Sequence, residues 1–129
     1  MKAHKHGANT CPCGSGQPYD RCCGPCHQGT PAATAEALMR SRYSAYCLGL
    51  RDYLLATWHP DTRPASLDLD EAPKPQWIGL DIRRANADQV EFVARYKVNG
   101  RAHKLHELSD FRQIDGRWYY LSGTFPDSP

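Results

Sequence analysis

Long hydrophobic runs are missing from this sequence. Its longest apolar stretches, around Leu38 and Leu54, are interrupted by arginine and aspartate, so no segment approaches the roughly 20 apolar residues that cross a membrane. No apolar run of signal-peptide length follows the first residues. We therefore expect a cytoplasmic protein without a membrane span.

A strong charge of one sign is also missing. The 16 lysine and arginine residues stand against 14 aspartate and glutamate residues, which leaves a net charge of +2. This balance is far from the basic excess that binding to a phosphate backbone usually needs, and it argues against nucleic acid as a partner. The 129 residues are too few for two full-size domains. Their 40% hydrophobic and 23% charged content is typical of a folded globular protein.

Charge and cysteine are both concentrated near the N-terminus. The first thirty residues hold three basic residues and one acidic residue, whereas the remaining 99 hold thirteen of each sign. Five of the six cysteines lie between Cys11 and Cys26, and Cys47 stands alone. We therefore divide the chain into a small cysteine-rich knob with a basic N-terminal tail, residues 1–30, and a near-neutral domain, residues 31–129.

The spacing of the knob's thiols indicates a metal site. A C-x-C pair is followed after eight residues by an adjacent C-C pair. In a reducing compartment such thiols are better explained as metal ligands than as disulfides, and four thiolates make a closed structural zinc site. We predict that Zn²⁺ supplies most of the free energy that orders this short segment. The alternatives are disulfides or free thiols, Cys26 or His27 as a substituted fourth ligand, and iron in place of zinc.

The domain after the knob begins with helical patterns and continues with strand patterns. We predict a helix over Ala35–Leu48, capped by Thr34 and ended by Gly49, and a second helix from about Leu50 to Trp58. An irregular connection of about fifteen residues follows. Alternating patterns and two Asx-Gly turns, Asn99-Gly100 and Asp115-Gly116, then predict an antiparallel sheet. Its strands are expected at Trp77–Arg84, Gln89–Val98, Arg101–Ile114 and Arg117–Ser122.

Two parts of the sequence resemble known families. Residues 11–24 read C-P-C-G-S-G-x-x-Y-x-x-C-C-G, which is similar to the SEC-C motif found at the C-terminus of the translocation ATPase SecA. Residues 35–46, the Thr57–Pro60 segment and the Gly116–Tyr120 segment extend the resemblance to the YchJ-like family over nearly the whole chain.

The resemblance implies an α+β fold with an N-terminal zinc-binding SEC-C knob. A domain similar to nuclear transport factor 2 is expected to follow it, with a cone-shaped, curved antiparallel sheet packed on helices. The implied metal ligands are Cys11, Cys13, Cys22 and Cys23. By analogy with SecA, a protein partner in the secretion or translation machinery is expected. The resemblance names no reaction, because the biochemical role of the family is not established.

The two turns also set the register of the sheet. They place Phe92 opposite Glu107, Phe111 opposite Tyr120 and Ser109 opposite Ser122, and opposite residues share a face. The concave face is then largely apolar but includes a carboxylate. A bulge in the long strand would instead turn His106 and Leu108 inward.

A carboxylate on a half-buried aromatic face needs a partner, for which Arg40, Arg42 and His59 are candidates. One interpretation is a pocket with an acid/base pair, and the other is a Glu–Arg pair that fixes the helix in the sheet. The candidate pocket consists of Arg42, Trp58, His59, Tyr96, His103, Glu107, Ser109 and Tyr120.

Two functions follow from these features. The first is a zinc-binding protein-interaction adaptor that uses the knob. The second is a small-molecule enzyme or binder that uses the cone pocket, with Glu107 and a histidine as acid/base groups.

Overall fold

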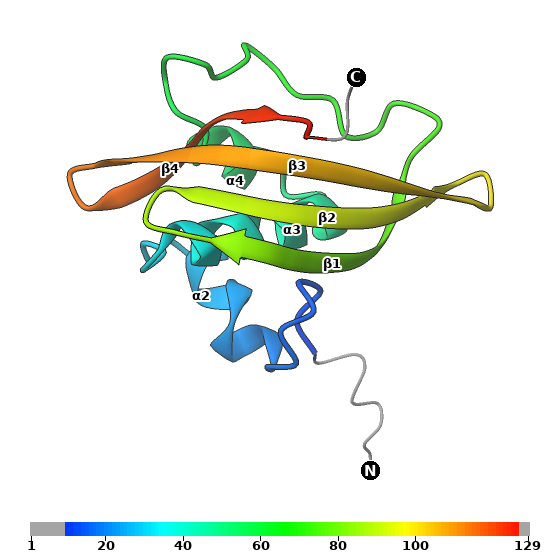
Figure 1. The fold of residues 1–129 in the computed structure, drawn as a ribbon, viewed down its shortest axis with the longest axis horizontal. Helices are drawn as coiled ribbons and strands as arrows, with labels where there is room; N and C mark the ends of the chain where they lie inside the picture. Colours follow the sequence, from blue (N-terminus) through cyan, green and yellow to red (C-terminus); the bar gives the residue numbers. More distant parts are fainter. Residues whose placement is uncertain (1–9, 127–129) are drawn as a thin grey trace.

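The structure is a computed structural model that describes residues 10–126. The expected basic tail lies in residues 1–9, outside the described part. The knob consists of a loop, a single 3₁₀ turn, η1 (Tyr19–Arg21), and a short helix, α2 (Cys23–His27). It lies beneath the sheet and beside the longer helices (Figure 1).

The first long helix agrees with the prediction. Helix α3 spans Ala35–Leu48, and the Thr34 hydroxyl accepts a hydrogen bond from the Ala37 N–H at 3.0 Å, which satisfies one of the free donors of the first turn. Gly49 ends the helix with a φ of +74°.

Helix α4 (Arg51–Ala56) is shorter than predicted. The chain leaves the helix before Trp58, which forms a parallel bridge with Tyr120. Backbone hydrogen bonds on both sides of this bridge, from Tyr120 N–H to Thr57 O at 2.8 Å and from His59 N–H to Tyr120 O at 2.7 Å, hold the segment in extended form. Pairing with a strand far along the chain therefore overrides the local helical pattern.

Four antiparallel strands form one sheet in which each strand pairs with the next one along the chain, as predicted. The two turns between the last three strands have positive φ at both central residues, +52° and +79° at Asn99-Gly100 and +51° and +82° at Asp115-Gly116, which is the geometry of tight hairpins. The strands are β1 (Gln76–Ala85), β2 (Gln89–Val98), β3 (Arg101–Ile114) and β4 (Arg117–Thr124).

The register agrees with the prediction except at one end of β4. Phe92 faces Glu107 and Phe111 faces Tyr120, but Ser109 faces Gly123 rather than Ser122. A register shift beside Phe111 leaves an extra residue in β4, whereas the alternation of β3 continues unchanged. Glu107 therefore stays on the concave face, and His106 stays on the other.

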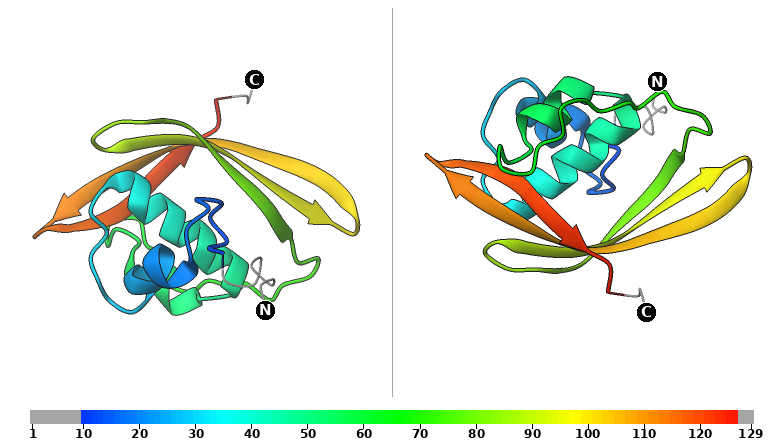
Figure 2. Two further views of the ribbon diagram at one scale, coloured as in Figure 1. Left: turned by 90° about the horizontal axis from the view of Figure 1, so that it is seen from below. Right: turned by 90° about the horizontal axis from the view of Figure 1, so that it is seen from above.

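The sheet curves around α3 and α4, which lie on its concave side (Figure 2). Residues of α3 such as Leu38 and Tyr43 are buried with Val90, Phe92 and Phe111 of the sheet. The buried thiols Cys11, Cys13 and Cys23 belong to the same apolar cluster. The knob and the cone thus share one core. None of the helices within residues 10–126 is long and apolar enough to span a membrane.

Candidate functional site

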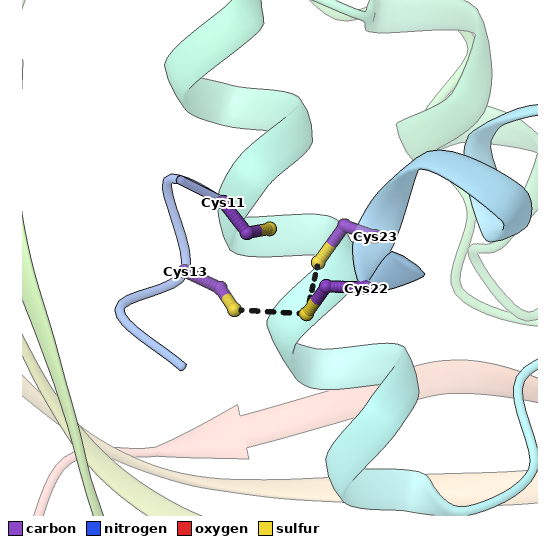
Figure 3. Close-up of side chains that lie close together, drawn as sticks. All are labelled: Cys11, Cys13, Cys22 and Cys23. Atoms are coloured by element: carbon purple, nitrogen blue, oxygen red, sulfur yellow. Dashed lines mark hydrogen bonds between the residues drawn. The ribbon is translucent and has the colours of Figure 1, made fainter. Parts of the chain in front are cut away.

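Four thiols of the knob converge on one point (Figure 3). The Sγ atoms of Cys11, Cys13, Cys22 and Cys23 all lie within 4.8 Å of one another, with Cys13 and Cys22 at 3.6 Å and Cys22 and Cys23 at 4.0 Å. Zn–S bonds of about 2.3 Å place the sulfurs of a tetrahedral site about 3.8 Å apart, whereas a disulfide needs about 2.05 Å. The six cysteines are free of disulfides, and the cluster could hold a metal ion.

The local structure of the knob brings the two cysteine pairs together. A backbone hydrogen bond from the Cys11 N–H to the Gln17 carbonyl at 2.9 Å closes the loop that follows the first pair. The η1 turn then returns the chain so that Cys22 precedes α2 and Cys23 begins it. Adjacent residues can serve as two ligands here because the chain turns sharply at Cys22, with φ of −124° and ψ of −98°.

Helix α3 supplies the surroundings of the thiols. Arg40 Nη1 donates to the Cys13 carbonyl at 3.2 Å and lies 3.8 Å from the Cys13 sulfur, and the Ser44 hydroxyl lies 3.5 Å from the Cys11 sulfur. A hydrogen bond from Cys23 lowers the pKa of the Cys13 thiol to about 4, while that contact and burial raise the pKa of Cys23. A guanidinium beside the thiolates offsets their negative charge, as outer partners of metal ligands commonly do.

The alternative ligands lie apart from the cluster. Both ring nitrogens of His27 have other partners, Tyr19 OH at 2.6 Å and the Ser41 carbonyl at 2.8 Å. Cys26 is half-buried, and its burial raises the pKa of its thiol. Within residues 10–126, the four cysteines form the one group of three or more potential ligands. The geometry therefore favours the all-cysteine set over a substituted ligand.

A second feature is a cavity of about 240 Å³ between α3 and the concave face of the sheet. Its walls are mainly aromatic and aliphatic, with a carboxylate, a guanidinium and a hydroxyl among them. Five of the eight pocket candidates line it: Arg42, Trp58, Glu107, Ser109 and Tyr120. The other lining residues are Met39, Tyr43, Tyr46, Trp77, Phe92, Ala94 and Leu105.

Glu107 is 8% exposed and accepts two hydrogen bonds on one carboxylate oxygen. Its Oε2 atom lies 2.7 Å from Ser109 Oγ and 3.1 Å from Tyr120 OH. Burial and the nearby carboxylate raise the pKa of Tyr120, so the phenol stays protonated and donates. Gly123 lies on the neighbouring strand, β4, and a Cβ atom at this position would overlap the Glu107 carboxylate. The missing side chain of Gly123 thus makes the room that this carboxylate occupies.

Arg42 is 4% exposed and uses one nitrogen to fix its position. Nη1 donates to the Leu54 carbonyl at 2.8 Å and to Thr57 Oγ1 at 2.7 Å. The guanidinium carbon lies 4.7 Å from the centre of the Tyr120 ring and 5.1 Å from that of the Trp58 ring. Burial lowers the pKa of Arg42, because removing the guanidinium from water disfavours its charged form.

The expected Glu–Arg pair is not what holds this carboxylate. Among the described residues, the salt bridges within 4 Å do not include Glu107, and its partners are hydroxyls. Arg40 points to the knob, where it donates to the Cys13 carbonyl, and it also pairs with Glu36 on its own helix. Arg42 and Glu107 therefore face the same cavity with opposite charges and without direct contact.

The other three candidates lie outside the cavity. His59 is buried, but its ring accepts from the Asp61 N–H at 3.0 Å and packs against Tyr119, because Trp58 and His59 point to opposite sides of their extended segment. Tyr96 and His103 stack on each other at 5.3 Å. They lie toward the end of the β2–β3 hairpin, which projects past the helices (Figure 1).

A larger hollow of about 810 Å³ adjoins the cavity. It lies between residues 68–76 and the end of α3, and both spaces share the side chains of Tyr46 and Trp77 as walls. The two rings are 6.0 Å apart.

Sequence reasoning missed two kinds of site residue. Tyr43, Tyr46 and Trp77 line the cavity but were not among the pocket residues expected from the sequence. The same reasoning also overlooked Gly123, where a glycine inside a strand pattern is a usual sign of close approach by another group.

Comparison with known proteins agrees with both parts of the chain. Residues 9–25 match the SEC-C motif, and residues 34–123 match the family described as YchJ, middle NTF2-like domain. The chain belongs to the YchJ-like family. A UPF0225 protein of Chromobacterium violaceum is 55% identical to this YchJ-like chain, over 95% of the chain and 98% of the relative. One from Methylibium petroleiphilum is 54% identical, over 92% and 90%.

Two solved structures resemble this YchJ-like protein throughout its length. The solution structure of a SEC-C motif containing protein from Rhodopseudomonas palustris has a TM-score of 0.78 and 37% identity, covering 92% of this chain and 99% of that one. The crystal structure of a SEC-C motif containing protein from Psychrobacter arcticus has a TM-score of 0.70 and 31% identity, covering 93% and 84%. The combination of knob and cone is therefore a shared architecture.

Proposed function

We propose that this protein binds a small organic molecule in the cavity, while a zinc ion at Cys11, Cys13, Cys22 and Cys23 holds the knob against α3. One observation carries the proposal: Glu107 and Arg42 are each more than nine-tenths buried and line the same hollow space without contacting each other. Burying a charge is costly even when part of its hydrogen-bonding capacity is used, so a polar ligand that bridges the two groups would offset part of their desolvation.

The cavity has the composition of a ligand site. Aromatic and aliphatic walls surround a few polar groups, which is the usual arrangement for small molecules. Its volume of about 240 Å³ equals that of about eight water molecules in the liquid, which suits a ligand of roughly ten non-hydrogen atoms. His59 and His103 lie elsewhere, so the proposal is one of binding and assigns no reaction.

Filling the cavity tests this function. Ala94 lines the cavity and is buried on β2, so Ala94→Leu would occupy part of the space. Ala102→Leu is the matched control, because Ala102 is exposed on β3. The zinc-loaded proteins are incubated with a bacterial small-molecule extract, and retained compounds are identified by native mass spectrometry. Wild type and Ala102→Leu should retain a compound that Ala94→Leu loses. Equal retention by all three, or none by any, would contradict the proposal.

A second candidate function is a protein-interaction adaptor in the secretion or translation machinery. One observation favours it: the thiols face α3, whereas the loop between the two pairs, including Gln17, Asp20 and Arg21, is exposed. This loop leaves a surface free for a partner while the metal site holds its shape. A cytoplasmic location, where thiols stay reduced, belongs to both candidates.

Co-sedimentation with ribosomes tests the adaptor. The protein is compared with the double variant Asp20→Ala, Arg21→Ala, and with Arg95→Ala on the exposed face of β2 as control. If the knob is the binding surface, the double variant should leave the pellet while its zinc content stays unchanged. Loss of binding in Arg95→Ala as well, or binding that survives chelation of the metal, would argue against the knob.

A further inference from the structure

We infer that the ligand of the cavity is a neutral, planar heterocycle that presents an N–H and a carbonyl side by side, as a cyclic amide does. This inference rests on the proposed function and deepens it. It follows from the charges, the open hydrogen-bonding positions and the walls of the cavity.

The charges of the cavity favour a neutral ligand. Glu107 and Arg42 are its two charged side chains, and they carry opposite signs. A cationic ligand would gain from Glu107 but would meet the desolvated guanidinium. An anionic ligand would gain from Arg42 but would meet the carboxylate. A ligand without net charge can contact both groups and add no buried charge of its own.

The unused hydrogen-bonding positions of Glu107 and Arg42 favour a ligand that carries a donor beside an acceptor. Ser109 and Tyr120 both donate to Oε2 of Glu107, so Oε1 has no donor among residues 10–126. Arg42 uses Nη1 for Leu54 and Thr57, which leaves Nε and Nη2 without acceptors in the same part of the chain. An N–H on the ligand would satisfy Glu107, and a carbonyl would satisfy Arg42.

Tyr120 connects the two charged residues. Its hydroxyl donates to Glu107 at 3.1 Å, and its ring lies 4.7 Å from the Arg42 guanidinium carbon. One side chain thus contacts both charged groups, so the carboxylate and the guanidinium lie on either side of Tyr120 in the same cavity. A cyclic amide carries its N–H and C=O on adjacent ring atoms, so a single ring can present a donor to Glu107 and an acceptor to Arg42.

The walls favour a flat ligand. Tyr43, Tyr46, Trp77 and Phe92 line the cavity around the polar positions, and Trp77 lies edge-on to Tyr43 with ring centres 6.0 Å apart. Aromatic walls stack well on planar rings and bind flexible polar chains poorly. The volume of about 240 Å³ admits a bicyclic ring system.

Three bicyclic probes of similar size separate the contributions of the N–H donor, the carbonyl acceptor and the flat ring. The probes are 2-quinolone, which carries the N–H and the carbonyl, 1-methyl-2-quinolone, which lacks the donor, and naphthalene, which lacks both. Affinities for the zinc-loaded full-length protein are measured by protein-observed NMR titration. We expect 2-quinolone to bind at least about tenfold more tightly than either other probe, since an unpaired buried partner costs about that factor or more.

A substitution at Glu107 tests whether its carboxylate contacts the N–H of the ligand. Glu107→Gln keeps the shape and an acceptor for Ser109 and Tyr120, but turns the open acceptor into a donor. It should weaken 2-quinolone about tenfold or more while leaving naphthalene unchanged, which shows that the cavity is intact. The matched control Glu91→Gln lies on the same sheet, where its carboxylate pairs with His106 and Arg84 away from the cavity. It should leave the affinities for all three probes unchanged.

The outcomes distinguish a failure of the inferred ligand class from a failure of the proposed binding function. Equal affinity for 2-quinolone and naphthalene would overturn the ligand class and leave a binding cavity standing. Tighter binding of naphthalene-2-carboxylate or of 2-naphthylmethylammonium than of 2-quinolone would overturn the neutral class in favour of a charged ligand. Binding of none of the probes, together with no retained compound in the extract experiment, would overturn the proposed function itself.

Discussion

At the scale of single residues, the surroundings of Glu107 show how one buried charge is accommodated. Two hydroxyls satisfy one carboxylate oxygen, and a glycine on the adjacent strand makes the space. The buried cation nearby is fixed by Leu54 and Thr57 instead of by the carboxylate. Each charge is thus held in place separately, which keeps the space between them available.

Replacing Gly123 tests how tightly the Glu107 carboxylate packs against this strand. A Cβ at this position would overlap the Glu107 carboxylate, so Gly123→Ala should lower the free energy of unfolding by about 2 kcal/mol or more. Gly79→Ala is the control, because a Cβ on Gly79 meets nothing within 4 Å. The two variants are compared by urea unfolding. Equal stability of the two would show that the strand yields easily at Gly123.

The ligand set can be tested with two thiols that lie close in sequence. Cys22→Ser removes a member of the four-thiol cluster, whereas Cys26→Ser removes a thiol outside it. Wild type and Cys26→Ser should contain about one zinc per chain, and Cys22→Ser should lose most of its zinc. Metal content is measured by mass spectrometry of the purified proteins. Zinc loss in Cys26→Ser instead would assign Cys26 to the site.

At the scale of elements, α3 connects the two candidate sites. One side of the helix faces the knob through Arg40 and Ser44, and another faces the cavity through Arg42, Tyr43 and Tyr46. Residues two positions apart on a helix point in different directions, which explains how one element serves both. The position of this helix therefore matters for metal and ligand alike.

The capping residue of α3 offers a mild test of the helix. Thr34→Ala removes the acceptor for the Ala37 N–H and should lower the free energy of unfolding by about 1 kcal/mol. Thr34→Ser keeps a hydroxyl acceptor and should stay within a few tenths of a kcal/mol of wild type. Urea unfolding followed by circular dichroism measures both. An equal loss in the two variants would mean that the methyl group of Thr34, not the cap, stabilises this end.

At the scale of the whole molecule, knob and cone form one body. Three of the four clustered thiols are buried in the same apolar cluster as Leu38, Tyr43 and Phe92. Arg117 of β4 also reaches across to the Gly29 carbonyl at 3.3 Å. A metal ion in the knob would therefore stabilise the cone as well as its own loop.

Removing the metal should accordingly destabilise the whole chain. Chelation is expected to lower the melting temperature by about 10 °C or more in one cooperative transition, because a loss of about 3 kcal/mol shifts a domain of this size by that much. Differential scanning calorimetry measures the transition. The control is re-addition of zinc, which should restore it. A cone that melts unchanged while the thiols become reactive would show that the knob contributes nothing to the cone.

The sequence by itself determined the local structure. Thr34 and Gly49 bound α3, two Asx-Gly turns set the hairpins, and alternation placed Glu107 on the concave face, because these features depend on neighbours a few residues apart or on fixed strand pairing. The spacing of the cysteines likewise indicated a metal site.

Only the tertiary structure decided what these residues meet. It brought Trp58 to Tyr120 and ended α4 early, it placed Gly123 opposite Ser109 through a bulge, and it turned His59 away from the cavity. Each outcome depends on contacts between segments about 15 to 60 residues apart, whose energies exceed local preferences and leave little trace in a local pattern. The open space between Glu107 and Arg42 is of this kind, because it arises from how helix and sheet meet.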